Sequence, residues 1–135
     1  MHDEEIRQIL DEYHHVAVVG LSPKEDRPSY EVSKFLQEHG FHIVPVHPRA
    51  ETILGEKVYH RLEDIPFPVD IVDVFRRPED TPDVAESAVR IGAKVLWLQL
   101  GIKNEVARSI AEAGGLRVIE DRCMKIEYAR LFNHR

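Results

Sequence analysis

Residues 16–30, VAVVGLSPKEDRPSY, say most about how this chain folds. The apolar run 16–19 is typical of a strand that is buried on both faces of a parallel sheet. Gly20 ends the run, and Pro28 suits the first turn of a helix. A strand, a glycine turn and a helix in this order begin a Rossmann-like nucleotide-binding domain. The loop between them, however, has one glycine where a dinucleotide fingerprint has three.

The rest of the chain alternates strands with helices. Hydrophobic periodicity predicts helices at 3–13, from 28 to 40, after Pro78, at 104–115 and at 125–132, and strands at 15–19, 41–46, 69–75, 94–100 and 116–120. Residues 49–66 hold only a turn near Gly55 and one helical turn near Leu62. Alternation of this kind implies right-handed crossovers and a sheet covered on both faces.

We therefore predict one α/β domain over residues 1–135, a Rossmann-like three-layer fold with a five-stranded parallel sheet. We expect the first strand to be central and the strand order to be 3-2-1-4-5. Ligands of such sheets bind beyond the carboxyl ends of the strands, at the point where the strand order reverses. The expected site is therefore formed by residues 20–27 and 99–101, which follow the first and fourth strands.

Composition and charge exclude several classes of function. The chain has 135 residues, of which 43% are hydrophobic and 31% charged, as in a single soluble domain. Its net charge of −6 argues against a nucleic-acid partner, because a polyphosphate needs a coherent cationic face. No apolar run approaches the roughly 18 to 20 residues that cross a bilayer. The acidic N-terminus does not have the character of a signal peptide.

Cysteine and histidine usage adds two further expectations. One cysteine allows no disulfide framework, which fits a reducing compartment, so we expect a cytoplasmic protein. The eight histidines lack the spacing that places metal ligands on one face, so we predict no metal site.

The loop after the first strand is the first candidate for ligand binding. Ser22 can offer its hydroxyl and backbone N–H to a phosphate, and the helix that starts near Pro28 points its positive end toward the same place. Two cations can add charge-assisted hydrogen bonds. The alternative is an ordinary solvated loop, since acidic residues are interspersed. The candidate residues here are Gly20, Leu21, Ser22, Lys24 and Arg27.

The end of the second strand argues against NAD. An NAD-binding domain has an acidic residue there for the ribose hydroxyl. This chain has His47, Pro48 and Arg49 instead, which suit a phosphate on the adenosine ribose. NADP and coenzyme A (CoA) both carry such a phosphate, so the feature does not choose between them. An ordinary turn with an exposed arginine remains the alternative.

The third and fourth strands end in further candidates. Phe75 and Arg76 follow the third strand, where the arginine either flanks a ligand or forms salt bridges with the acidic residues after it. Gln99 offers an amide beside the expected switch point, and Gly101 permits close approach of the backbone.

Cys123 lies just beyond the last strand, near the expected start of a helix and beside Arg122 and Lys125. These features favour the thiolate, although a lone cysteine is more often buried and inert. No Ser/His/Asp set, carboxylate pair or Cys/His/Asn spacing is present in the sequence. We therefore predict no catalytic residues and leave open whether the protein is an enzyme.

Taken together, these segments resemble the small single-domain CoA-binding proteins, a family that shares the nucleotide-binding domain of the succinyl-CoA synthetase α subunit. The resemblance covers about residues 13–132, with one departure at His47, where members often have asparagine. It rests on six motifs in order, VAVVGLSPKxDRPSY from Val16, VPVHP from Val44, ILGEKVY from Ile53, DIVDVFRR from Asp70, WLQLG from Trp97 and DRCMK from Asp121.

The resemblance implies CoA as the ligand. It places the CoA phosphates on the first loop, the adenosine at the end of the second strand, and the pantetheine arm along the ends of the third and fourth strands. It does not imply synthetase chemistry, because the domain that carries the phosphorylated histidine is absent from these residues.

Three hypotheses follow. The first is a non-catalytic CoA or acyl-CoA binding protein, the second an NADP-dependent oxidoreductase, and the third a redox protein that forms a Cys123–CoA mixed disulfide. The acyl group, any protein partner and the formation of a homo-oligomer stay open.

Overall fold

The structure, a computed structural model, describes residues 2–132 and contains every expected element. The helices are α1 (Asp3–Glu12), α2 (Pro28–Glu38), α3 (Thr81–Arg90), α4 (Glu105–Ala113) and α5 (Met124–Phe132). The strands are β1 (His15–Val19), β2 (His42–Val46), β3 (Thr52–Ile53), β4 (Glu56–Lys57), β5 (Ile71–Val74), β6 (Val95–Leu98) and β7 (Arg117–Ile119). Single 3-10 turns lie at Leu62–Asp64 and Pro78–Asp80. The expected turn near Gly55 joins β3 and β4 into a short antiparallel hairpin.

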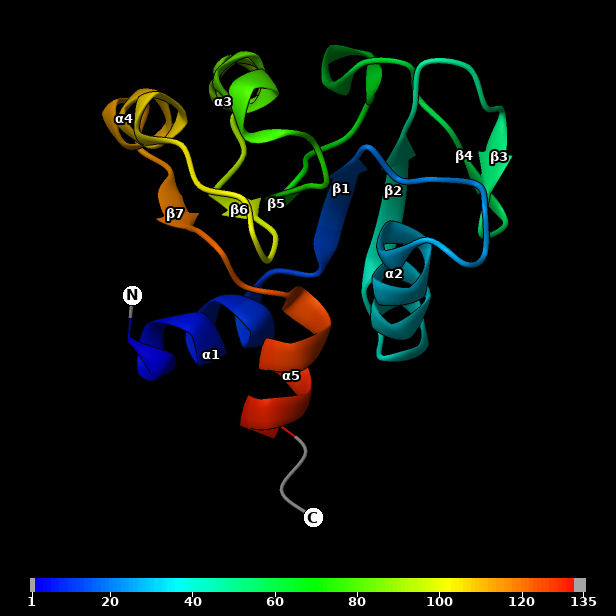
Figure 1. The fold of residues 1–135 in the computed structure, drawn as a ribbon, viewed down its shortest axis with the longest axis horizontal. Coiled ribbons are helices and arrows are strands. Elements are labelled where there is room, and N and C mark those ends of the chain that lie inside the picture. Colours follow the sequence, from blue (N-terminus) through cyan, green and yellow to red (C-terminus); the bar gives the residue numbers. More distant parts are fainter. Residues whose placement is uncertain (1, 133–135) are drawn as a thin grey trace.

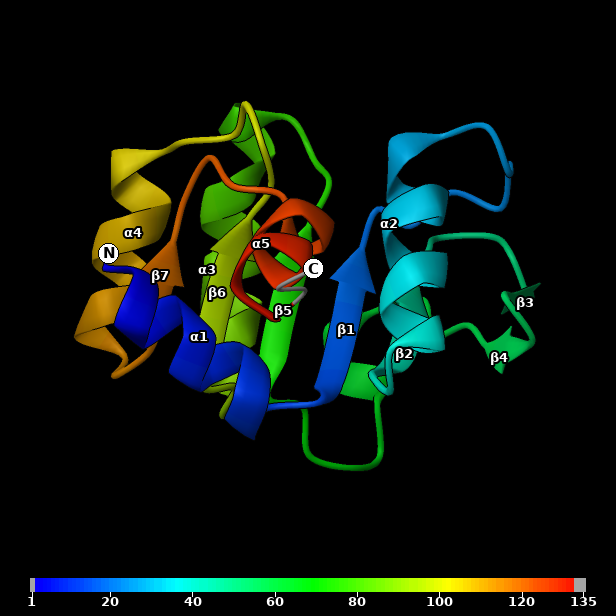
Figure 2. The ribbon, with the colours of Figure 1, turned by 90° about the horizontal axis from the view of Figure 1, so that it is seen from below.

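Five strands form one parallel sheet in the order β2-β1-β5-β6-β7 (Figure 2). Helices α1, α2 and α5 cover one face, and α3 and α4 cover the other (Figure 1). The predicted α/β, Rossmann-like, three-layer fold with a five-stranded parallel sheet is therefore confirmed.

The predicted strand order, 3-2-1-4-5, is wrong. Counted along the chain, the sheet strands lie in the order 2-1-3-4-5, because β5 pairs with β1 and leaves β2 at the edge. Pro45 gives a physical reason, since a proline cannot donate to a ladder and is confined to edge strands. The outer side of β2 is occupied by Tyr59, whose N–H donates to Pro45 O at 3.0 Å. The order therefore reverses between β1 and β5, one strand earlier than expected.

Alternation along the strands divides the core into two layers. In β1, Val16 and Val18 face α1, α2 and α5, whereas Ala17 and Val19 face α3 and α4. The register pairs Asp73 of β5 with Val18 and Trp97, which both lie in the layer beneath α1, α2 and α5. A carboxyl group is thus placed in an otherwise apolar layer.

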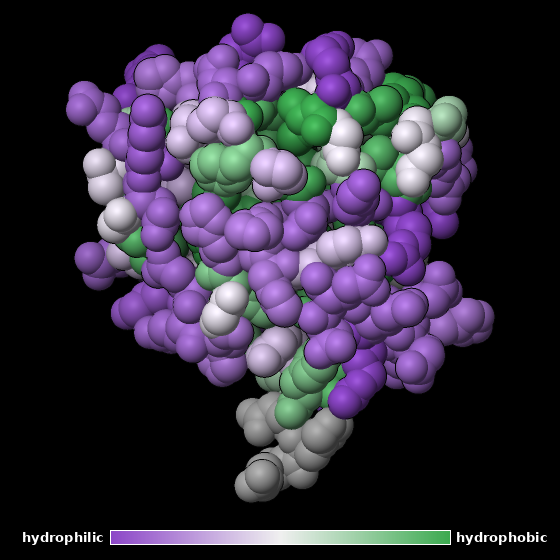
Figure 3. Space-filling view, turned by 180° about the vertical axis from the view of Figure 1, so that it is seen from behind, coloured by the Kyte–Doolittle hydropathy of each residue, from purple (hydrophilic) through white to green (hydrophobic). Residues whose placement is uncertain are grey.

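The surface is mostly polar. Figure 3 shows the molecule from behind, with hydrophilic residues over most of the face and hydrophobic ones gathered in its upper part. None of the helices within residues 2–132 combines the length and apolar character needed to cross a bilayer.

Candidate functional site

Gly20 marks the point where three strands meet at their carboxyl ends. Its φ of +89° lies in the left-handed region, and a Cβ atom added there would be 2.4 Å from the carbonyl oxygen of Phe75. Its N–H donates to Val46 O at 3.2 Å. Gly20 therefore allows the end of β1 to lie directly against the end of β5 while it stays bonded to β2. Any residue with a side chain forces these ends apart.

A cavity of about 670 Å³ opens beside Gly20, over the ends of β1, β5 and β6 and between the first turns of α2 and α5. We call it the central cleft. Its walls are formed by Gly20, Ser22, Arg27, Pro28, Ser29, Val32, Phe75, Arg76, Arg77, Pro78, Gln99, Leu100, Ile102, Cys123 and Ile126.

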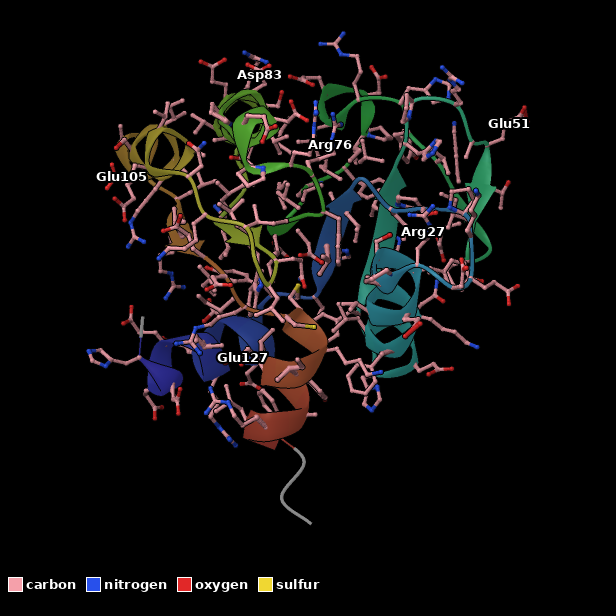
Figure 4. All side chains as sticks on the ribbon, viewed as in Figure 1. Arg27, Glu51, Arg76, Asp83, Glu105 and Glu127 are labelled. Atoms are coloured by element: carbon pink, nitrogen blue, oxygen red, sulfur yellow. The ribbon has the colours of Figure 1, made fainter. Side chains whose placement is uncertain are left out.

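The charge of the central cleft is opposite to that of the chain. Arg27, Arg76 and Arg77 line it, and no acidic residue does, although the protein carries a net charge of −6. Figure 4 shows Arg76 above the end of β1 and Arg27 at the start of α2. Arg76 and Arg77 also approach Asp80, at 3.5 and 3.2 Å, so the expected salt bridges form as well. Among residues 2–132, Arg27 has no ion-pair partner, which leaves a cation at the mouth of the cleft.

A second cavity of about 300 Å³ continues from the first on the α3 side. We call it the adjoining groove; it shares Gly20 and Arg76 with the central cleft. His47 and Pro48 line it, together with two arginines, Arg61 and Arg90, and two acidic residues, Glu63 and Asp83. Both arginines form ion pairs with Glu63, at 3.7 and 2.5 Å. One ligand can therefore pass across Gly20 and occupy both cavities.

His47 is oriented by the turn that follows β2. Its Nδ1 accepts the backbone N–H groups of Arg49 and Ala50, at 3.1 and 3.0 Å. This assigns the tautomer with hydrogen on Nε2, and this N–H donates to no residue within 2–132. Arg49 is exposed and lines neither cavity.

The opening loop is held by its own serines. The N–H of Ser22 donates to Ser29 Oγ at 3.0 Å, and Ser22 Oγ accepts the N–H of Lys24 at 3.1 Å. The N–H of Ser22 is therefore not free for a phosphate, contrary to expectation, and only the hydroxyl hydrogen remains. The side chain of Leu21 is buried in the core, and Lys24 is exposed and lines neither cavity.

Gln99 is buried at the floor of the central cleft and is bonded to a residue that sequence reasoning missed. Its Nε2 donates to Asp73 Oδ1 at 2.5 Å. Burial raises the pKa of Asp73 to about 7. The run 69–75 contains two acidic residues, Asp70 and Asp73, and only Asp73 falls inside the strand, where sequence analysis expected apolar side chains. Gly101 does not line the cleft; its N–H donates to Asp121 Oδ1 at 2.6 Å.

Cys123 directly precedes α5, as expected, and is a half-buried residue of the cleft wall. Arg122 is bonded to Glu127 at 3.1 Å, and the Lys125 Nζ lies 5.4 Å from the ring centroid of Phe35. Both cations expected to favour the thiolate thus have other partners. Within residues 2–132, no three His, Cys, Asp or Glu side chains gather in a way that could hold a metal ion.

Nine of the thirteen predicted site residues line the two cavities: Gly20, Ser22, Arg27, His47, Pro48, Phe75, Arg76, Gln99 and Cys123. The remaining four, Leu21, Lys24, Arg49 and Gly101, lie in the same loops but outside the walls. The aliphatic residues that follow the fourth strand and line the central cleft were not predicted either. The sequence pattern does not distinguish a side chain in a cavity wall from any other surface side chain.

A parallel sheet with Gly20 at its switch point, and a cationic cleft beyond its carboxyl ends, define a Rossmann-like domain. Residues 14–129 match the family described as CoA binding domain. The chain belongs to this family.

Comparison with known proteins agrees with this assignment. The chain is 44% identical over 125 residues to "Uncharacterized protein YneT" of Bacillus subtilis (strain 168), with 93% of both chains covered. It is similar to the structure of a hypothetical protein from Pyrococcus horikoshii OT3, with a TM-score of 0.94 and 42% identity, over 97% of this chain and 92% of that one.

A more distant relative has a named activity. The chain is 29% identical over 123 residues to acetate–CoA ligase (ADP-forming) II subunit alpha of Pyrococcus furiosus. The match covers 82% of this chain and 27% of the ligase subunit, so it corresponds to about a quarter of that protein.

Proposed function

We propose that this chain binds coenzyme A, or an acyl-CoA, across the central cleft and the adjoining groove, without catalysis of its own. The observation that carries the proposal is the central cleft, whose charged lining residues are all arginines in a chain with a net charge of −6. Charge-assisted bonds from arginine suit a diphosphate. Membership of the CoA binding domain family supports the same ligand.

The two cavities differ in polarity, as do the two ends of CoA, the phosphorylated adenosine and the pantetheine arm. The adjoining groove has the His47 Nε2–H as a donor for a ribose phosphate, and Arg61 and Arg90, which pair with Glu63 in the groove wall, keep further N–H groups that can donate. The central cleft has apolar walls, from Val32, Phe75 and Ile102 among others, which suit the pantetheine arm. The diphosphate then lies over Gly20 beside Arg76, which both cavities share.

The proposal of binding without catalysis rests on the absence of a base near the nucleophile. Cys123 Sγ makes no hydrogen bond with any residue in 2–132, and no histidine lines the central cleft. A catalytic thiol is normally activated by a base within hydrogen-bond reach.

Native mass spectrometry tests the choice of ligand. The protein is incubated with equimolar CoA, NADP and NAD, and its intact mass is measured under non-denaturing conditions. We expect one CoA for each chain, with little NADP and less NAD. A predominant NADP adduct contradicts the proposal and favours an NADP-dependent oxidoreductase. The same spectrum reports whether the chain forms a homo-oligomer.

A second candidate function follows from the position of Cys123 in the cleft wall. If the pantetheine arm lies along the central cleft, its sulfur can reach this thiol. The Cys123 thiolate would attack one sulfur of CoA disulfide, form a protein–CoA disulfide and release one CoA thiolate. Incubation with CoA disulfide should then add one CoA mass that reductant removes. Cys123→Ser is the control, and an unmodified wild-type protein contradicts this function.

A further inference from the structure

Asp73 is a buried carboxyl group that the proposed binding of phosphates does not use. It lies in the middle of β5, is 0% exposed, and has Val18 and Trp97 as its register neighbours. Its Oδ1 accepts from Gln99 Nε2 at 2.5 Å, and its Oδ2 is sealed from solvent without a partner. Such a group in an apolar layer is unfavourable for folding, since burial without a partner disfavours the charged form.

Burial raises the pKa of Asp73 to about 7. Its ionisation therefore opposes folding over the acidic to neutral range. Local departures of this kind from an apolar core are typical of functional positions. The position of Asp73 beneath the central cleft indicates where its role is to be sought.

The direct effect of Asp73 is on the orientation of Gln99. Asp73 Oδ1 accepts from Gln99 Nε2, and this bond holds the NH₂ of the Gln99 carboxamide toward the core. The other end of the carboxamide, Gln99 Oε1, is then turned away from Asp73, and Gln99 is one of the residues that line the cleft. This oxygen has no hydrogen-bond partner among residues 2–132, and unlike Asp73 Oδ2 it is not sealed from solvent. The floor of the cleft thus presents a fixed acceptor.

That acceptor contrasts with the charged groups around it. The charged residues of the central cleft are all arginines, which only donate. They suit phosphate oxygens and cannot bind an amide N–H. The pantetheine arm carries secondary amides, whose N–H groups need an acceptor when they are removed from water.

We propose that Gln99 Oε1 accepts a hydrogen bond from an amide N–H of the ligand's arm, and that Asp73 is the positioning residue that holds Gln99 for this contact. The inference rests on the proposed binding of CoA and adds a determinant of specificity, recognition of the amide-bearing arm in addition to the phosphates. A ligand with the same nucleotide but no arm gains nothing from either residue.

The test compares CoA with adenosine 3′,5′-bisphosphate, which lacks the arm and the outer of the two 5′-phosphates, by calorimetric titration. Gln99→Leu should weaken CoA by about fivefold, the usual size of one neutral hydrogen bond, and leave the bisphosphate unchanged. Asp73→Val removes the partner of Gln99 altogether, so the side chain spreads over more than two orientations and CoA should be weakened by between about twofold and about fivefold. In Asp73→Asn, the side-chain carbonyl can still accept from Gln99 Nε2, so CoA affinity should stay within about twofold of the wild type. Twofold is the largest loss expected if the Gln99 amide takes its two orientations equally often.

Ser33→Ala is the matched control. Ser33 Oγ is also buried without a partner, but Ser33 does not line the cleft, so its loss should change neither affinity. If the wild-type protein binds both ligands and the Gln99 and Asp73 variants change both equally, or neither, this inference is wrong and the proposed function stands. If the wild-type protein does not bind CoA, the proposed function itself fails.

Discussion

Gly20→Ala tests the contact between the ends of β1 and β5 on which the whole site depends. Alanine at a φ of +89° is strained, by about 1–2 kcal/mol for a left-handed residue. Its Cβ would also lie 2.4 Å from Phe75 O, so that the end of β5 has to move by about 1 Å to restore van der Waals contact. Overpacking of this kind costs about 1–3 kcal/mol. We expect the free energy of unfolding to fall by about 2–5 kcal/mol in total.

Gly40→Ala separates the two contributions. Gly40 has a similar φ, +92°, but nothing lies within 4 Å of an added Cβ, so only the backbone strain applies. Urea unfolding of both variants gives the difference directly, with the slope m expected to be unchanged. CoA affinity should fall in Gly20→Ala, because Phe75 and Arg76 line the site, and stay as in the wild type in Gly40→Ala. If the two variants lose equal stability, Gly20 is not in close contact with Phe75 and our account of the switch point is wrong.

Three further predictions concern buried groups and the ligand phosphate. The folded-state pKa of Asp73, about 7, lies above its ordinary value of 3.8, so the contribution of Asp73 to stability becomes less favourable as pH rises from about 4 to about 7. Asp73→Asn should remove this dependence, so that above pH 7 its free energy of unfolding exceeds that of the wild type by up to about 4 kcal/mol. Urea unfolding at a series of pH values measures the difference, and parallel pH profiles of the two proteins contradict the prediction. Trp97→Phe leaves the carbonyl of Arg122 without the 2.7 Å bond from Nε1, and should lower stability by about 1–3 kcal/mol in thermal unfolding, whereas an unchanged Tm refutes that role. Dephospho-CoA lacks the 3′-phosphate, so a charged hydrogen bond from the protein is lost and calorimetry should show binding weaker than that of CoA by about 1.5–3 kcal/mol. Equal affinities would mean that the 3′-phosphate of bound CoA lies in solvent.

Much of the fold could be predicted because each element has its own hydrophobic period. The buried run at 16–19 and the apolar stripe of α1 needed no tertiary information. Predicting which strands are neighbours does require tertiary information, since a buried strand has the same apolar sequence pattern at any position in a parallel sheet. Pro45 is a local signal that β2 is an edge strand, and the predicted strand order did not take it into account.

The part of the candidate site that could be predicted is the set of loops that form it, because the topology of the sheet determines which loops meet. Loops that follow parallel strands gather at one edge, and Gly20, Arg76, Gln99 and Cys123, which were predicted on this ground, line one cavity. Which side chain of a loop faces the cavity depends on turn geometry, which explains why Lys24 lies outside. The Asp73–Gln99 bond joins two strands, and only the register of β5 against β6 reveals it.

The most direct test of the account is a heteronuclear NMR titration of the labelled protein with CoA. The backbone amide resonances of Gly20 and Gly101, at the carboxyl ends of β1 and β6, should shift on binding. Those of Gly40 and Gly115, which precede β2 and β7 at the opposite edge of the sheet, should stay in place. Shifts at Gly40 and Gly115 with an unchanged Gly20, or no shifts at all under a large excess of CoA, would contradict CoA binding in the central cleft.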